Sequence, residues 1–286
     1  MKQIVMISGK GGAGKTTVLA SFAALAKAKV LGDCDVDAAN LYLLLHPEEG
    51  TREEFLGAKV AVRDADLCTG CGECERRCRF EAITVDEVNW MACEGCGLCV
   101  LACPVQALKL ETVVNGTLFT GRTAYGPMVH ARLRPAAENS GRLVTRVRQE
   151  AETVALREQL PLILLDGAPG IGCTVTASLV DTDLAVVVTE PTLSGIHDMQ
   201  RVVELAGMLQ VPVAMITNKA DINPEHTAGI RRFCADRNVP LLAELPYDED
   251  AVRANAHQQT LVEFSDGSAA TGIRQAWDQL EQAMAL

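Results

Sequence analysis

Eight of the eleven cysteines lie within one short stretch of the chain, where they form two runs of four. Each run has the spacing Cys-x2-Cys-x2-Cys-x3-Cys, and a proline, Pro104, follows the second run. Thiolates gathered at such short intervals are typical of metal ligands, whereas disulfides are rare in a reducing compartment. The two runs are Cys68, Cys71, Cys74 and Cys78, and then Cys93, Cys96, Cys99 and Cys103.

The spacing of these runs resembles that of bacterial ferredoxins with two 4Fe-4S clusters, in which the fourth cysteine of each run binds the other cluster. The resemblance implies a first cluster on Cys68, Cys71, Cys74 and Cys103 and a second cluster on Cys93, Cys96, Cys99 and Cys78. Arg79 stands where such ferredoxins carry proline, so we expect more polar surroundings for the second cluster. The alternative is two zinc sites, but these pair Cys-x2-Cys units across longer loops.

The cysteine-rich stretch repeats itself, because residues 68–85 align with residues 93–110 with cysteines and glycines in register. Two copies predict a two-fold module, and the glycines permit the tight chain reversals that turn sulfurs and N–H groups toward a cluster. These glycines are Gly70, Gly72, Gly95 and Gly97. We expect a ferredoxin-like domain over residues 57–112, inserted into an α/β domain made of residues 1–56 and 113–286.

A second motif lies near the amino terminus, where residues 9–16 read Gly-Lys-Gly-Gly-Ala-Gly-Lys-Thr. The motif follows a predicted strand and opens a predicted helix, as a phosphate-binding loop does. Backbone N–H groups of such a loop surround phosphate oxygens, while Lys15 neutralises phosphate charge and the Thr16 hydroxyl reaches Mg2+. The predicted contacts to the nucleotide are Gly11, Gly12, Ala13, Gly14, Lys15, Thr16 and Thr17.

Lys10 gives the loop a second lysine, and in this respect the loop resembles that of the MinD/ParA superfamily. That superfamily includes the nitrogenase iron protein and the Mrp-type cluster carriers. Its additional lysine reaches the nucleotide of a second subunit, so the resemblance implies a catalytic role for Lys10 and a dimer around two ATP molecules. The second subunit is expected to be another copy or a similar ATPase chain.

Residues 33–41 resemble the switch I segment of the same superfamily. The resemblance implies that Asp35 orients the attacking water, which makes Asp35 a catalytic residue together with Lys10 and Lys15. For Asp33 and Asp37, the alternative to a role in the nucleotide site is that of a cap or turn residue, and we favour this alternative for Asp37.

Two later segments also match the superfamily. Residues 162–172 resemble the Walker B strand and switch II, which implies that Asp166 lies beside Mg2+ at the end of a strand. Asn218 and Pro246 match positions near the adenine. Asn218 is the residue that we expect to contact the base.

Strand and helix patterns alternate on both sides of the cysteine-rich stretch, and near-continuous apolar strands are typical of a parallel sheet covered on both faces. We expect strands at 3–7, 30–31, 162–165, 184–189, 211–217 and 240–245, and helices at 16–27, 142–159 and 273–284. A polar connection is expected over residues 115–141. The predicted fold is α/β: a doubly wound, mostly parallel sheet of the phosphate-loop NTPase type with a ferredoxin-like insert.

The composition excludes some classes of protein. A formal net charge of −11 and a pI of about 5.0 argue against a general nucleic-acid-binding surface. No stretch approaches the roughly twenty apolar residues that cross a bilayer, and we find no signal peptide, so we expect a cytoplasmic protein that binds no membrane. The last helix has Arg274 as its only cation, and core packing explains its apolar stripe better than membrane binding does.

The two motifs together predict Mg2+-dependent ATP hydrolysis and iron–sulfur chemistry on one chain. The first hypothesis is an ATPase, slow without its partner, whose dimer changes control electron transfer through two 4Fe-4S clusters to a redox partner. The alternative is an ATP-dependent factor that assembles an iron–sulfur or other metal cofactor for a partner metalloprotein. The cysteine spacing favours the first hypothesis, because carriers hold a labile cluster on few cysteines at a dimer interface.

Overall fold

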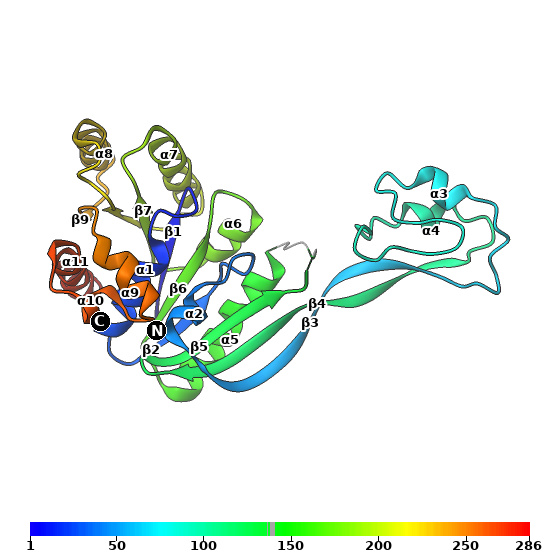
Figure 1. The fold of residues 1–286 in the computed structure, drawn as a ribbon, viewed down its shortest axis with the longest axis horizontal. Helices are drawn as coiled ribbons and strands as arrows, with labels where there is room; N and C mark the ends of the chain where they lie inside the picture. The colour runs from blue at the N-terminus through cyan, green and yellow to red at the C-terminus, as the bar shows by residue number, and fades with distance from the viewer. Residues whose placement is uncertain (136, 138–140) are drawn as a thin grey trace. The chain divides into compact units, whose positions relative to one another are not determined.

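The computed structural model describes residues 1–135, 137 and 141–286 (Figure 1). The chain divides into two compact units. The first unit consists of Met1–Arg52, Leu118–Arg132 and Asn139–Leu286, and the second consists of Glu53–Thr117 and Leu133–Glu138. The first unit therefore contains the phosphate-loop motif, and the second contains all of the clustered cysteines.

Among the described residues, nine strands form one sheet in the order β3-β4-β5-β2-β6-β1-β7-β8-β9. From β5 to β9 in this order, every strand is parallel to its neighbours. The strands are β1 (Lys2–Ser8), β2 (Lys29–Asp33), β3 (Glu48–Arg63), β4 (Leu108–Thr123), β5 (Gly126–Leu133), β6 (Leu162–Pro169), β7 (Leu184–Thr189), β8 (Val213–Thr217) and β9 (Leu241–Glu244). This arrangement confirms the predicted α/β fold with a mostly parallel sheet.

Helices cover both faces of the parallel strands. Ile4 and Met6 of β1 belong to a core cluster with residues of α1 and α11, and Val5 and Ile7, which point to the other face, are fully buried too. Helices α5 and α6 contact β2 and β6, and α7 contacts β7. The helices are α1 (Lys15–Leu25), α2 (Leu41–Leu45), α3 (Glu73–Arg77), α4 (Leu98–Ala102), α5 (Arg142–Glu158), α6 (Cys173–Leu179), α7 (Leu193–Met208), α8 (Pro224–Asp236), α9 (Glu249–Ala256), α10 (Leu261–Phe264) and α11 (Ser268–Met284).

The polar connection expected over residues 115–141 is wrong, because much of that range belongs to β4 and β5. Residues 136 and 138–140 of the range lie outside the described residues. The neighbouring strands β4 and β5 are joined by only two residues, which makes them an antiparallel hairpin. Glycine within β4 obscured the strand pattern, but a side chain at Gly121 would clash with the backbone of Glu48 in β3.

The second unit repeats its backbone with the offset of the sequence repeat. Helices α3 and α4 are equivalent, and each follows a glycine in the left-handed region, Gly72 with φ 72° and Gly97 with φ 77°. Glu81 and Gln106 are also equivalent, and both have left-handed φ, at 51° and 54°. The two copies in the sequence are therefore two copies of one local structure.

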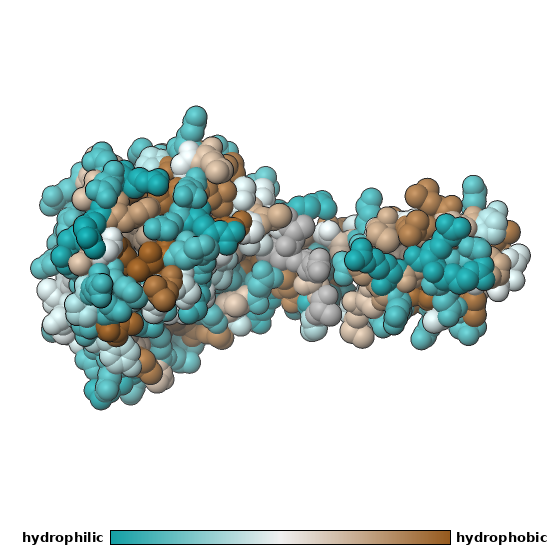
Figure 2. Space-filling view, turned by 90° about the horizontal axis from the view of Figure 1, so that it is seen from above, coloured by the Kyte–Doolittle hydropathy of each residue, from teal (hydrophilic) through white to brown (hydrophobic). Residues whose placement is uncertain are grey.

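Apolar residues lie scattered among mostly hydrophilic ones on the surface of each unit (Figure 2). In the described part of the chain, none of the helices is long and apolar enough to span a membrane. Helix α11 buries Ile273, Trp277 and Leu280, so core packing accounts for its apolar stripe.

Candidate nucleotide site and cysteine cavities

The phosphate-loop motif connects the carboxyl end of β1 to α1. Gly12 and Gly14 have left-handed φ values of 83° and 97°, which glycine adopts without strain. Gly11 is exposed, Ala13 is buried and Thr17 is half-buried in α1. No side chain caps the first turn of α1 and no acidic residue lies in it, so its N–H groups are available to an anion.

Lys15 lies between two carboxylates, with Nζ 3.4 Å from Asp35 Oδ2 and 3.6 Å from Asp166 Oδ1. All three residues are buried. Burial by itself lowers the pKa of Lys15, but the charges of Asp166 and Asp35 outweigh it, and the pKa is raised. Burial also raises the pKa of Asp35, against the opposing effect of Lys15. Lys15 is therefore a cation at neutral pH.

Thr16 and Asp166 together offer oxygens to a divalent cation. Thr16 Oγ1 donates a hydrogen bond to Asp166 Oδ2 at 2.6 Å. The other carboxylate oxygen, Asp166 Oδ1, is buried and accepts no hydrogen bond from the described residues. Because Mg2+ prefers oxygen ligands, this open acceptor beside a hydroxyl fits a Mg2+ ion that arrives with a nucleotide.

Asp33 anchors the segment that follows β2. Its Oδ1 accepts a hydrogen bond from Asp35 N at 3.1 Å, and its Oδ2 accepts one from Leu41 N at 3.2 Å. Asp33 is fully buried and lies beside Asp166 in the register of β2 and β6, so burial and the neighbouring carboxylates raise its pKa well above the usual range. The structure thus gives Asp33 the cap role that was its alternative, and with it the task of positioning Asp35.

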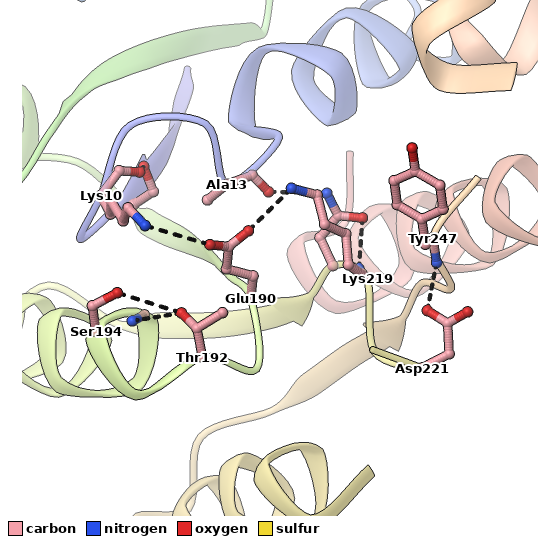
Figure 3. Close-up of polar contacts among 11 residues, drawn as sticks. Lys10, Ala13, Glu190, Thr192, Ser194, Lys219, Asp221 and Tyr247 are labelled. Atoms are coloured by element: carbon pink, nitrogen blue, oxygen red, sulfur yellow. Dashed lines mark hydrogen bonds and ion pairs between the residues drawn. The ribbon is translucent and has the colours of Figure 1, made fainter. Parts of the chain in front are cut away.

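Lys10 lies on the outer side of the loop, where its Nζ is 3.7 Å from Glu190 Oε1 and its side chain is 51% exposed. Lys219 Nζ is 3.1 Å from Glu190 Oε2, so Glu190 lies between the two lysines (Figure 3). A half-exposed pair at this distance is weak, and Lys10 can leave it for a stronger anion. Sequence analysis gave Glu190 and Lys219 no role, although both lie in segments that match positions of the MinD/ParA superfamily, just after β7 and β8.

The two predicted base contacts lie at the same edge of the sheet as the loop. Asn218 Nδ2 donates a hydrogen bond to Ala13 O at 2.9 Å, and a side chain at Gly14 would clash with that amide. Leu245 N donates to Thr217 O at 2.8 Å, which brings the following residue, Pro246, beside the end of β8. Next to it, Tyr247 N donates to Asp221 Oδ1 (Figure 3).

Two cavities in the second unit are each lined by four cysteines. The first is lined by Cys68, Cys71, Cys74 and Cys103, and the second by Cys93, Cys96, Cys99 and Cys78. Each cavity takes three cysteines from one run and its fourth from the other run. This is the grouping that the resemblance to ferredoxins implies.

Backbone N–H groups point at cysteine sulfurs in equivalent places of the two copies. Ala82 N donates to Cys78 Sγ at 3.3 Å, and Ala107 N donates to Cys103 Sγ at 3.2 Å. Such donors stabilise the thiolate, and in iron–sulfur proteins hydrogen bonds to sulfur tune the reduction potential.

Strand β3 contributes to both cavities. Ala61 N donates to Cys93 Sγ at 3.4 Å. Hydrogen bonds from the Gly70 backbone and from Arg63 lower the pKa of Cys68. Within the described ranges, no three or more His, Cys, Asp or Glu side chains form a group that could hold a metal ion.

Two known sequences resemble the chain to different extents. The chain is 29% identical over 285 residues to an uncharacterized protein of Methanocaldococcus jannaschii, MJ0578, which covers 98% of this chain and 96% of that protein. It is 28% identical over 116 residues to the cytosolic Fe-S cluster assembly factor Nubp1 homolog of Drosophila grimshawi. The second match covers 33% of this chain and 37% of that protein.

The solved structure of the septum site-determining protein MinD, complexed with Mg-ADP, from Pyrococcus horikoshii has the same fold. It aligns with a TM-score of 0.61 at 17% identity, over 99% of this chain and 97% of that one. Residues 4–262 match the sequence profile of a nucleotide-binding domain, which agrees with the loop, the lysine and the carboxylates described above. The chain therefore belongs to the CobQ/CobB/MinD/ParA nucleotide-binding domain family.

Proposed function

We propose that this protein is a Mg2+-dependent ATPase whose second unit holds two 4Fe-4S clusters, and that its nucleotide state controls electron transfer through them. The observation that carries the proposal is the grouping of the cysteines, four to a cavity with one exchanged between the runs, on the same chain as an open phosphate loop. Neither feature has a role in the other's chemistry, so their presence on one chain favours coupling between nucleotide and cluster.

In the nucleotide site, the N–H groups of the loop and of the first turn of α1 would bind the phosphates, and Lys15 would neutralise their charge. Thr16 and Asp166 would hold Mg2+, because Asp166 Oδ1 accepts no hydrogen bond from the described residues and has only the Lys15 ammonium nearby, at 3.6 Å. Asp35, which Asp33 holds through its backbone N–H, would orient the attacking water once a phosphate draws Lys15 away.

In the second unit, Cys68, Cys71, Cys74 and Cys103 would bind the first cluster, and Cys93, Cys96, Cys99 and Cys78 the second. When bound, such clusters supply one-electron transfer. The cysteines of each run lie close together, and each cavity takes its fourth cysteine from the other run. This arrangement favours clusters over zinc sites, which pair Cys-x2-Cys units across longer loops.

A dimer completes the proposal. Lys10 is bound only weakly within its own chain, which suits a residue that contacts a nucleotide held by a second subunit. The second subunit is another copy or a similar ATPase chain, and a redox protein accepts or supplies the electrons.

The direct test is anaerobic purification followed by metal analysis and a redox titration monitored by electron paramagnetic resonance. About eight irons and about eight sulfides per chain are expected for two four-iron clusters. Reduction potentials or rates of electron delivery should differ between the ATP-analogue, ADP and nucleotide-free forms. Zinc in place of iron contradicts the clusters, and potentials and rates that ignore the nucleotide contradict the coupling.

A second candidate function is the assembly of metal cofactors in another protein, which the partial similarity to the Nubp1 homolog favours. Four cysteines at each cavity favour retention of a cluster over its release. Incubation of the iron-loaded protein with an apo-ferredoxin distinguishes the two functions, because quantitative, ATP-dependent transfer of iron and sulfide favours assembly.

A further inference from the structure

The first unit contains a third cavity, of about 320 Å3, that neither the nucleotide nor the cysteines account for. It is lined by α2 with the residues that follow it, and by parts of β3, β4 and β5 (Figure 1). Its volume falls within the range of about 300–1,000 Å3 that is usual for small-molecule sites. In β5, His130 lies beside Asp33 of β2 in register, so the cavity is at the carboxyl end of parallel strands, where α/β proteins bind ligands.

His130 forms one wall of this cavity without a partner for its ring nitrogen. The imidazole stacks on Tyr42 with centroids 5.0 Å apart and planes 8° apart, and on Phe119 at 4.9 Å and 11°. His130 is only 5% exposed, and its Nδ1 has no hydrogen-bond partner among the described residues. Burial and the charge of Arg132 lower its pKa to about 4, so the ring is neutral at pH 7 and one nitrogen remains a donor.

Two arginines give the cavity its positive charge. The Arg132 guanidinium lies 4.1 Å from the centre of the Tyr42 ring, and that of Arg52 lies 5.8 Å from the centre of the Phe119 ring. Neither arginine forms an ion pair with a carboxylate in the described part of the chain. Glu48 is the one carboxylate among the described lining residues, so cations predominate.

Apart from His46, the remaining lining residues are apolar or small. Leu43, Pro47 and the ring of Phe119 offer an apolar surface next to the two arginines, and Leu43 is 53% exposed. A guanidinium held by aromatic rings is oriented in advance and binds a carboxylate or phosphate with two parallel hydrogen bonds. The cavity thus combines anion-binding groups with an apolar wall.

We propose that this cavity binds a small organic anion, with its carboxylate or phosphate head at Arg132 and Arg52 and its apolar or aromatic body against Leu43 and Phe119. The two guanidinium groups lie over aromatic rings and have no carboxylate partner among the described residues, so an anionic head is the partner that their charge favours. The site is separate from the phosphate loop and does not depend on the proposed function.

Calorimetric titration of the intact protein tests this site with probes of known chemistry. Benzoate and phenyl phosphate carry head and ring, acetate and inorganic phosphate carry the head alone, and phenol carries the ring alone. Saturating Mg-ADP fills the nucleotide site, and repetition in the Lys15→Ala variant removes the phosphate loop as a competing anion site. We expect one of the ring-bearing anions to bind at least about tenfold more tightly than its head alone and than phenol. Tighter binding of benzoate would show that the head is a carboxylate, and tighter binding of phenyl phosphate would show that it is a phosphate.

Variants assign the binding to the cavity. Arg132→Gln and Arg52→Gln should each lower the affinity for the preferred probe by at least about tenfold, because a hydrogen bond from a charged donor is lost. Arg237→Gln is the matched control, because Arg237 also lies over a ring, that of Phe233, but outside the cavity. The proposal is overturned if neither ring-bearing anion binds, if the heads or phenol bind as tightly, or if both cavity variants bind like the control.

Discussion

Three buried carboxylates, those of Asp33, Asp35 and Asp166, face the buried ammonium of Lys15. One cation does not balance three carboxylates, and burial together with mutual repulsion raises the pKa of Asp33 and Asp35. At the scale of single residues, the proposed role of the site in binding Mg-ATP rests on this excess of carboxylates and on the Asp166 oxygen that accepts no hydrogen bond from the described residues.

Replacing Lys15 with alanine should reduce ATP hydrolysis by at least about 100-fold, because a preorganised charge at the phosphates is lost. Phosphate release by the anaerobically purified protein is the measurement. Lys27→Ala is the matched control, since Lys27 is exposed just beyond α1. Hydrolysis by Lys15→Ala within a few-fold of the control would contradict the assignment.

Lys29 makes stability depend on pH. Burial lowers its pKa from 10.5 to about 8, and its side chain donates to Ala26 O at 2.8 Å. Between pH 8 and pH 10.5 Lys29 is protonated in the unfolded chain and neutral in the folded chain, so the free energy of unfolding rises with pH over this range. The stability that the neutral Lys29 allows is fully present above pH 10.5 and is lost as the pH falls through 8. Relative to Lys29→Met, wild-type stability should rise by about 2 kcal/mol from about pH 7.5 to about pH 10. A difference in unfolding free energy that is constant over this range would show that the ammonium is not buried.

At the scale of elements, the two cysteine copies provide a matched pair of glycines. Gly70 and Gly95 are equivalent and left-handed, with φ 68° and 60°. A side chain at Gly70 would meet no atom within 4 Å, whereas one at Gly95 would clash with the backbone carbonyl of Lys59. Identical local backbones therefore have different surroundings.

Gly70→Ala should cost about 1–2 kcal/mol from backbone strain alone, and Gly95→Ala should cost clearly more, because the β3 backbone must also move. Thermal unfolding and iron content of the two variants are the measurements. Gly95→Ala should also lose iron from the cavity of Cys93, Cys96 and Cys99. Equal effects of the two substitutions would mean that the second unit does not have this packing.

At the scale of the whole molecule, the phosphate loop and the clustered cysteines lie in different units. If the proposed clusters are present, Cys71→Ser should remove about half of the bound iron and should leave basal ATP hydrolysis within about twofold of wild type. Cys173→Ser is the control, because Cys173 is exposed outside both cavities. If Cys71→Ser abolishes hydrolysis in protein that remains folded, the two units are not separate in function.

Lys10 tests the dimer. Because its pair with Glu190 is long and half-exposed, Lys10→Ala should leave thermal stability within about 1 kcal/mol of wild type. In sedimentation experiments, wild type should dimerise with a non-hydrolysable ATP analogue and Lys10→Ala should not. Dimerisation of the variant at wild-type strength contradicts the role of Lys10, while a monomeric wild type points to a similar second chain as the partner.

The sequence by itself determined the nucleotide-binding family and the fold class, because both depend on local spacing. A loop such as residues 9–16 is one strand-to-helix turn, and its glycines and lysine act within that turn. The cysteine runs are equally local, and the fold class follows from apolar runs such as Leu184–Thr189, which became β7 unchanged. Each of these signals lies within about twenty residues of chain.

Only the tertiary structure decided which distant side chains meet. Strand order brings Asp33 beside Asp166, and two strand ends bring Glu190 and Lys219 to the loop. The cavity around His130 lies between a short helix and strands that the sequence did not reveal. Glycines in these strands allow the neighbouring backbones to approach closely, and they interrupt the alternation of apolar and polar residues by which a strand is recognised. Contacts between residues far apart in sequence depend on the sheet register, which local periodicity does not encode.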